Sequence, residues 1–226
     1  LHAGLRAGRM NVSVGPGTDS RFPSIEERFD DAAAPGLAAQ PDYTYTDLFA
    51  TLDTRDQPGN AREGAYVGAL WRRYNDLDLG RYDFDSVDVE AQHFLPIYDK
   101  KRVFAARLQL TATTAGDGHE VPFYFRPTVG GSTSLRSAAD FRFRDRNALV
   151  MNFEYRWEAF SGLDMALFSD FGTVAPRLSA LEFSRLRGAY GIGLRFNTYR
   201  AVFLRLDVAA GGSEGIRTFL KFSKAF

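Results

Sequence analysis

The sequence lacks cysteine, a net charge and any long apolar run, and each absence excludes a class of protein. Its 226 residues contain no Cys, which excludes a disulfide framework and thiolate metal sites. The 28 basic and 28 acidic side chains balance, so no basic excess predicts nucleic-acid binding. No stretch approaches the roughly 20 apolar residues of a membrane-spanning helix, and the N-terminal LHAGLRAGRM lacks the apolar centre of a signal peptide. The protein is therefore either soluble or crosses a membrane as strands.

Histidine is scarce, and the common catalytic motifs are missing. The three histidines, His2, His93 and His119, are far apart in the sequence, and no Gly-x-Ser-x-Gly elbow accompanies them. A Ser/His/Asp hydrolase is therefore not indicated. The sequence has neither a phosphate-binding glycine-rich loop before a helix nor a His-Glu-x-x-His zinc motif. We predict a protein without enzymatic activity, metal or cofactor.

What the sequence does have is an alternation of apolar and polar residues with a period of two. In residues 201–208 one face carries Val202, Leu204, Leu206 and Val208, and the other carries Phe203, Arg205 and Asp207. The same separation recurs in residues 147–157 and 188–197. A soluble sandwich would bury the apolar face, whereas a transmembrane barrel would turn it to lipid and line an aqueous lumen with the charges. The alternation alone is compatible with both folds.

Strand length and the spacing of the connections favour the barrel. We predict strands at 1–14, 42–54, 63–75, 81–98, 102–116, 147–160, 163–175, 188–200, 201–212 and 216–226. Most reach the roughly 9–11 residues of a tilted membrane strand, beyond the five or six usual in globular sheets. Tight turns at 56–60, 99–101, 161–162 and 198–200 alternate with loops at 15–41, 76–80, 117–146, 176–187 and 213–215. The predicted fold class is all-β, an antiparallel transmembrane β-barrel with short turns at one end and longer loops at the other.

Several motifs, in order, resemble the BamA-like barrels of the bacterial surface antigen family of outer-membrane assembly and translocation proteins. They are 53–64 (DTRDQPGNAREG), 130–157 (GGSTSLRSAADFRFRDRNALVMNFEYRW), 167–174 (LFSDFGTV), 190–196 (YGIGLRF) and the C-terminal strand. The resemblance extends from about residue 20 to the end. It implies a location in the bacterial outer membrane. The aromatic C-terminus also looks like the sorting signal of such barrels, formed by Leu220, Phe222 and Phe226.

The resemblance implies that the chain is part of a larger barrel. The family barrel has sixteen strands, and counting back from the C-terminus makes the ten predicted strands the seventh to the sixteenth. Residues 1–226 would then be the C-terminal portion of the barrel, with the upstream strands and the periplasmic domains outside this sequence. The connection 117–146 corresponds to the family's inward-folded sixth extracellular loop. We expect ten strands not to close alone, because two free edges would expose unpaired backbone groups to lipid.

The resemblance also assigns a site, here called the loop lock. Arg136 stands at the arginine of the family's loop-tip motif, and Glu154 and Asp170 stand at inward-facing acidic positions of the twelfth and thirteenth strands. A guanidinium can fork onto such carboxylates and hold the loop against the barrel wall. The alternative is ordinary lumen charge. Ser137 and Ala138 depart from the glycine and aromatic residue of the motif, so a weaker anchor or a different local geometry is expected.

The function implied by the resemblance is the folding and insertion of other outer-membrane β-barrel proteins, with the C-terminal strand as a lateral gate. The implied partners are unfolded outer-membrane protein substrates, outer-membrane lipid and assembly lipoproteins, but no nucleic acid. Three alternatives stay open. The barrel could be a passive pore, a protein secretion or translocation channel, or the barrel of a patatin-like lipase fusion.

Overall fold

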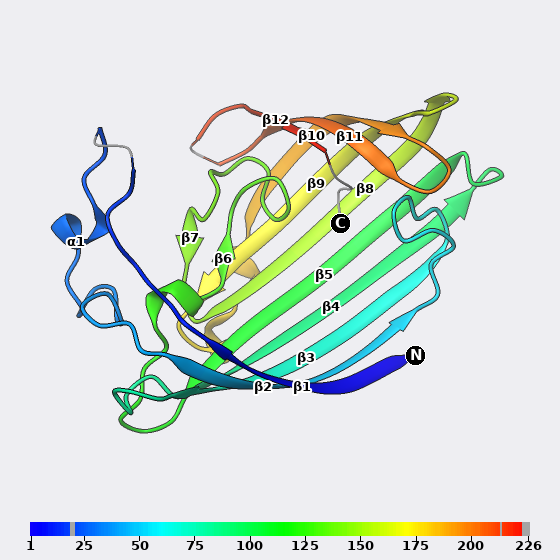
Figure 1. Cartoon of the computed structure of the whole chain (residues 1–226). Helices are drawn as coiled ribbons and strands as arrows, with labels where there is room; N and C mark the ends of the chain where they lie inside the picture. The colour runs from blue at the N-terminus through cyan, green and yellow to red at the C-terminus, as the bar shows by residue number, and fades with distance from the viewer. Residues whose placement is uncertain (19–20, 213, 223–226) are drawn as a thin grey trace.

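One large antiparallel sheet dominates the computed structural model, which describes residues 1–18, 21–212 and 214–222 (Figure 1). Within these residues the sheet has ten strands, each paired with its neighbours along the chain. The strands are β1 (His2–Met10), β2 (Tyr43–Asp53), β3 (Gly64–Asp76), β4 (Phe84–Ile97), β5 (Arg102–Ala115), β8 (Asn147–Phe160), β9 (Leu163–Ala175), β10 (Arg187–Asn197), β11 (Val202–Ala210) and β12 (Arg217–Lys221). Each overlaps its predicted range, and the predicted all-β antiparallel class is confirmed.

The remaining elements are short and lie in the connections. They are α1 (Ile25–Arg28), η1 (Phe123–Phe125), β6 (Thr128–Val129), β7 (Phe143–Arg144), η2 (Leu178–Ala180) and η3 (Phe183–Arg185). β6 and β7 pair with each other, a small sheet that the sequence pattern did not predict. Among the residues described, no helix is both long enough and apolar enough to cross a membrane.

The two faces of the sheet have opposite character. The register of the strands puts the buried polar and charged side chains on one face, among them Gln92, Asn152, Glu154, Asp170, Arg195, Arg205 and Asp207. The connection 116–146 contacts this face, which is the concave one. Large apolar side chains stand exposed on the convex face, among them Val67, Trp71, Leu95, Phe104, Leu108, Phe153, Leu167 and Ile192. A soluble sandwich would bury the apolar face, so this order is that of a barrel wall with lipid outside and polar groups inside.

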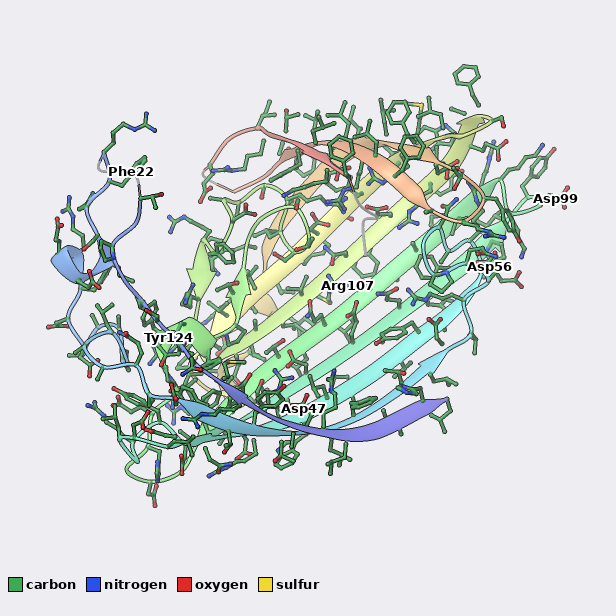
Figure 2. The ribbon with its side chains drawn as sticks, viewed as in Figure 1. Phe22, Asp47, Asp56, Asp99, Arg107 and Tyr124 are labelled. Atoms are coloured by element: carbon green, nitrogen blue, oxygen red, sulfur yellow. The ribbon has the colours of Figure 1, made fainter. Side chains whose placement is uncertain are left out.

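The connections lie at two ends of the sheet, here named the turn end and the loop end. The turn end carries 54–63, 98–101, 161–162 and 198–201, and the loop end carries 11–42, 77–83, 116–146, 176–186 and 211–216. Asp56 and Asp99 mark the turn end in Figure 2, and Tyr124 lies towards the opposite end. Three of the four connections at the turn end are short and the longest connections lie at the loop end, as predicted; the exception is 54–63, which is longer than the loop-end connections 77–83 and 211–216.

The sheet is strongly curved but open. In the part of the chain that the structure describes, β1 pairs only with β2 and β12 pairs only with β11. Figure 1 shows these two strands at opposite ends of the curved sheet. Ten strands therefore supply part of a barrel wall and leave two edges with free backbone groups.

A β-bulge in β11 makes one part of the predicted alternation wrong. The alternation places Val202 on the apolar face and Phe203 on the charged face. In the ladder, Leu204 pairs with Phe196 and Val202 with Asn197, so Phe203 is an extra residue. Phe203 is consequently 53% exposed, and Val202 is buried. The extra residue of a bulge inverts the alternation of the residues beyond it.

The last predicted strand, 216–226, is described up to Phe222, and within that part β12 covers Arg217–Lys221. Its final pair with β11 joins Lys221 to Arg205, and Phe222 follows the strand as an exposed residue. Leu220 lies within β12 and is exposed. Phe226 lies outside the described residues.

One connection at the turn end reaches across to distant strands. Residues 54–63, here called the strap, join β2 to β3. The N–H of Val202 donates to the carbonyl of Gly59 at 3.0 Å, within a parallel bridge to the β10–β11 turn. Arg62 forms an ion pair with Asp164 at the start of β9, with 2.6 Å between Nη2 and Oδ2. The predicted tight turn is therefore a strap that fastens the turn end of β2 and β3 to β9 and β11.

Candidate functional site at the tip of the inward loop

The connection between β5 and β8, residues 116–146, folds onto the concave face and is here called the inward loop (Figure 1). Its first part packs Val121 and Phe125 against the aromatic side chains of Tyr43, Tyr74 and Phe84 on β2, β3 and β4. Its second part crosses to β8 and β10. The loop therefore covers the concave face at the loop end from β2 to β10.

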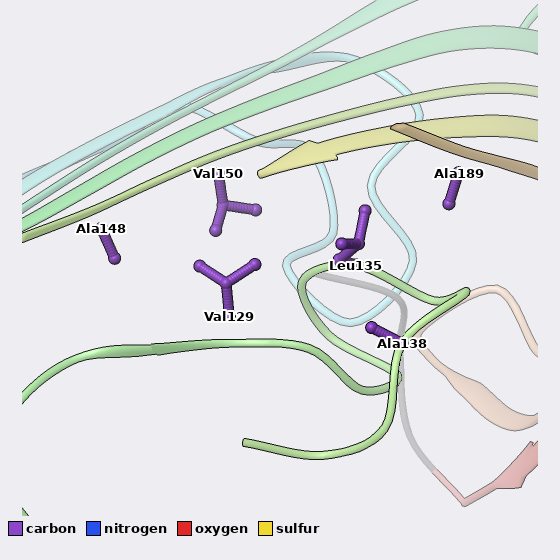
Figure 3. Close-up of a cluster of buried hydrophobic side chains, with 6 residues drawn as sticks. All are labelled: Val129, Leu135, Ala138, Ala148, Val150 and Ala189. Atoms are coloured by element: carbon purple, nitrogen blue, oxygen red, sulfur yellow. The ribbon is translucent and has the colours of Figure 1, made fainter. Parts of the chain in front are cut away.

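The second part of the inward loop buries a small apolar cluster. Val129, Leu135 and Ala138 from the loop face Ala148, Val150 and Ala189 from β8 and β10 (Figure 3). Ala138, which stands where the family motif has an aromatic residue, is buried in this cluster. The shorter side chain thus still packs against the wall.

The loop tip, residues 130–136, closes on itself by short hydrogen bonds. The Ser134 hydroxyl accepts from the Gly130 N–H at 2.9 Å and donates to the Gly130 carbonyl at 2.8 Å. Gly130 has a φ of 133°, and a Cβ there would overlap the Ala139 carbonyl oxygen. Only glycine permits this close return of the chain, and the turn directs Arg136 towards the wall.

Arg136 forks onto two wall carboxylates. Its Nε donates to Asp170 Oδ2 at 2.8 Å and its Nη2 to Asp170 Oδ1 at 2.7 Å, a bidentate pair. Its Nη1 donates to Glu154 Oε1 at 2.6 Å. The backbone N–H of Arg136 also donates to Asp170, at 3.1 Å. The structure thus brings together the three residues that the sequence analysis assigned to the loop lock.

An aromatic ring supports the guanidinium from below. Arg136 Cζ lies 3.4 Å from the ring centroid of Phe168 on β9. Phe168 faces Gly191 in the β9–β10 ladder, and a Cβ at Gly191 would overlap the ring. Gly191 therefore leaves the space in which Phe168 lies under Arg136, where the ring face attracts the cation.

A second layer of ion pairs surrounds Glu154. Arg195 donates to Glu154 Oε1 at 2.9 Å and to Asp207 Oδ1 at 2.6 Å, and Arg156 donates to Glu154 Oε2 at 2.8 Å. Glu154 therefore accepts from three arginines, counting Arg136. Because buried charges are costly unless paired, this network keeps the carboxylates in position for the loop tip.

Wall side chains also hold the backbone of the loop tip. The carbonyl oxygens of residues 132, 133 and 134 accept from Arg205 Nη2 at 2.7 Å, Arg107 Nη1 at 2.9 Å and Asn152 Nδ2 at 2.7 Å, in that order. The three donors lie on β11, β5 and β8. Arg107 stands near the middle of the concave face in Figure 2. Each carbonyl of this stretch is therefore held by a different strand.

The surroundings of Arg136 favour its charged form. Burial opposes the charge, but the carboxylates of Glu154, Asp170 and Asp207 outweigh burial and raise the pKa of the guanidinium above its ordinary value. Only 2% of Arg136 is exposed. The site is a permanently charged anchor rather than a proton donor, and its geometry suits it to fixing a loop.

The sequence pattern did not identify several members of this network. Phe168, Arg195 and Asp207 stand at inward positions of the alternation, yet which of them pair depends on the register between strands. The glycine at 191 opposite an aromatic residue was the available signal for the stacked ring. Leu220 and Phe222 lie away from the network, as exposed residues of β12 and its end.

Fold and site together define a class: an outer-membrane type of antiparallel barrel wall with a long loop anchored on its polar inner face. The Omp85 superfamily domain matches residues 38–219, and the chain therefore belongs to the Omp85 superfamily. This confirms the resemblance to BamA-like barrels that the motifs predicted.

Solved structures share the fold. BamA from Haemophilus ducreyi lacking POTRA domains 1–3 matches with a TM-score of 0.64 and 17% identity, over 80% of this chain and 42% of that one. CdiB from Acinetobacter baumannii matches with a TM-score of 0.55 and 16% identity, over 81% of this chain and 33% of that one. The chain thus spans less than half the length of either protein. Comparison with curated proteins finds no match.

Proposed function

We propose that these residues form the C-terminal portion of a bacterial outer-membrane barrel that folds and inserts other outer-membrane β-barrel proteins. The observation that carries the proposal is the inward loop, whose tip lies on the concave face and is held by buried ion pairs to Glu154 and Asp170. An assembly barrel tolerates such a loop, whereas an open pore needs a clear lumen. Membership of the Omp85 superfamily and the fold similarity to BamA support this function.

In this proposal β12 is the gate strand. Among the residues that the structure describes, up to Phe222, it has five residues, against nine to fourteen in the other strands of the large sheet. A short ladder is easier to open, and its edge can pair with an incoming strand. Such pairing lowers the cost of placing unpaired backbone groups in lipid. Leu220, Phe222 and Phe226 would form the sorting signal of the same segment.

The complete protein would supply what these ten strands lack. Six further strands would close the barrel, and periplasmic domains would precede them. Its partners would be unfolded outer-membrane proteins, assembly lipoproteins and the lipid around the convex apolar face. The 39% exposure of Trp71 on that face fits contact with lipid.

A translocation channel is the second candidate, and the polar lining of the concave face favours it. Arg107 pairs with Glu90 at 2.6 Å and contacts Gln109 at 2.7 Å, so polar groups continue beyond the loop tip. A polypeptide in transit would need such a surface and also a displaced inward loop. This candidate predicts a conducting barrel.

The discriminating experiment reconstitutes the complete protein in lipid vesicles and adds an unfolded outer-membrane barrel protein. We expect the substrate to become folded and protease-protected faster than in vesicles that hold an unrelated barrel of similar size. Equal rates in the two vesicle preparations would contradict the assembly function. A substrate released into the vesicle interior instead would support the channel.

A further inference from the structure

The carboxylate of Glu214 contacts both the inward loop and β12. Glu214 lies in the β11–β12 connection, and its Oε2 accepts from the backbone N–H of Ala139 at 2.9 Å. Its Oε1 accepts from Arg142 Nε at 2.6 Å, and Oε2 also accepts from Arg217 Nη2 at 2.9 Å. Ala139 and Arg142 belong to the inward loop, whereas Arg217 is the first residue of β12.

These contacts of Glu214 with the inward loop and β12 are here called the joint. Its residues in the inward loop are held firmly in place. Ala139 follows Arg136 by three residues, and Ala138 between them is buried in the apolar cluster. The N–H of Gly131 donates to the Ala138 carbonyl at 3.0 Å, so this segment is part of the closed loop tip. A displacement of the loop tip would therefore move the Ala139 N–H, and with it the donor to Glu214.

The strand side of the joint is weakly placed by comparison. Within the described part of the chain, which ends at Phe222, β12 pairs with β11 from Arg217 to Lys221. The connection before it contains Gly211, Gly212 and Gly215, all with positive φ, and glycine restricts the backbone least. Hydrogen bonds at Glu214 are therefore a large part of what fixes the start of β12.

Space for movement lies beside the joint. A cavity of about 330 Å³ separates the loop tip from β10 and the β11–β12 connection, and its lining includes Leu135, Arg142, Arg187 and Glu214. The Glu214 side chain is 19% exposed, so water reaches the carboxylate only in part. The N–H of Ala139 and the two arginines hold the pKa of Glu214 below its usual range, which keeps it charged at neutral pH.

We propose that Glu214 is a positioning residue that couples the inward loop to the gate strand, so that release of the loop tip loosens β12. The coupling rests on the proposed function only in calling β12 a gate. Loss of the Arg136 anchor would free Ala139, weaken the contacts at Glu214 and remove a restraint from Arg217. The loop lock would thereby regulate the edge to which a substrate strand pairs.

The test measures amide hydrogen exchange of β12 and of residues 137–146 in the complete, membrane-embedded protein. We expect Glu214→Ala to speed exchange in both segments by about tenfold, in the range of ordinary coupling free energies. Glu182→Ala is the control, because it also removes a glutamate that pairs with an arginine three residues away, Arg185, but at an exposed site in the neighbouring loop. Faster exchange confined to the β11–β12 connection would overturn the proposal.

A double-variant cycle tests the coupling itself. Arg136→Ala should speed exchange of β12 in the wild-type background and add little to it in the Glu214→Ala background. Equal acceleration by Arg136→Ala in both backgrounds would overturn the coupling. Migration of the folded, unheated protein in gels confirms that each variant still forms a barrel. If Glu214→Ala loosens β12 while substrate insertion stays at the wild-type rate, the coupling stands and the gate function fails.

Discussion

Burying an arginine is unfavourable unless carboxylates and hydrogen-bond acceptors compensate it, and Arg136 has both. Asp170 and Glu154 accept hydrogen bonds from its guanidinium, Asp207 lies 3.6 Å from its Nη1, and the ring of Phe168 lies beneath it. Glu154 and Asp170 are themselves buried, so the guanidinium offsets the cost of burying their charges, just as they offset the cost of burying the charge of Arg136. In the loop lock, each of the three buried charges of Arg136, Glu154 and Asp170 is therefore stable only while its partners are present.

Replacing Arg136 by Ala should therefore release the inward loop. The two carboxylates would lose a buried partner, a change that costs about 3–5 kcal/mol in proteins. We expect faster cleavage of the inward loop in the complete protein by a protease added from outside. Arg136→Lys is the control, since lysine keeps the positive charge but cannot form the bidentate hydrogen bonds to Asp170. Its cleavage rate should lie between those of the wild type and Arg136→Ala. Cleavage of Arg136→Ala at the wild-type rate would show that the lock does not hold the loop.

The close packing of Gly191 against Phe168 leads to a second prediction for a single residue. A methyl group there would overlap the Val208 carbonyl oxygen and the Phe168 ring, displacing the ring from under Arg136. Gly191→Ala should lower resistance to unfolding in urea, although alanine is usually the better strand residue. Gly188→Ala on the same strand is the matched control, because its Cβ would meet Phe171 at an ordinary 3.5 Å. Equal stability of the two variants would contradict the packing described here.

At the scale of elements, the strap depends on the charge of Asp56. Burial would raise the pKa of Asp56, but the N–H groups of Arg62, Glu63 and Gln57 donate to the carboxylate and, with Lys100, lower it below the usual range. Because the folded pKa is lower than the unfolded one, the stabilisation is complete above the unfolded pKa. It is lost as the pH falls through the folded value.

Asp56→Asn should accordingly reduce stability at neutral pH and flatten the loss that the wild type shows below about pH 4. Urea unfolding at a series of pH values measures this difference. Asp99→Asn, at the exposed β4–β5 turn of the same end, is the control and should behave as the wild type. A parallel pH profile for wild type and Asp56→Asn would show that Asp56 does not hold the strap.

The positions of the strands could be predicted from the sequence, but their register and the long-range contacts of the strap could not. Alternation located all ten strands of the large sheet, because an apolar convex face and a polar concave face repeat every second residue. It was wrong around Val202 and Phe203, since a bulge changes the register without a signal in the pattern. The reach of the strap to Val202 and Asp164 joins segments more than 100 residues apart, which local patterns do not encode.

The loop-lock site was also predicted only in part. Resemblance pointed to Arg136, Glu154 and Asp170, and the structure places them within hydrogen-bonding distance. The supporting residues were not predictable, because Phe168 and Arg195 meet Arg136 and Glu154 only through the register of neighbouring strands. The role of Glu214 was not predictable either, because its partners in the inward loop, Arg142 and Ala139, are 72 and 75 residues away in the sequence.

For the whole molecule, the two unpaired edges of the open sheet lead to a further prediction. β1 and β12 each have one unpaired edge among the described residues, and lipid cannot satisfy free backbone groups. Residues 1–226 produced alone should therefore fail to form a monomeric membrane barrel whose gel migration changes on heating. Such a barrel, formed from this segment by itself, would contradict the account of a partial wall.

The inward loop lies in the lumen because Arg136 anchors it to the wall. Single-channel conductance of the complete protein, compared between the wild type and Arg136→Ala, shows whether this anchor keeps the loop in the lumen. We predict small, flickering conductance for the wild type and larger, longer openings for Arg136→Ala. A large, steady conductance in the wild type that Arg136→Ala leaves unchanged would mean an open pore and would contradict the claim.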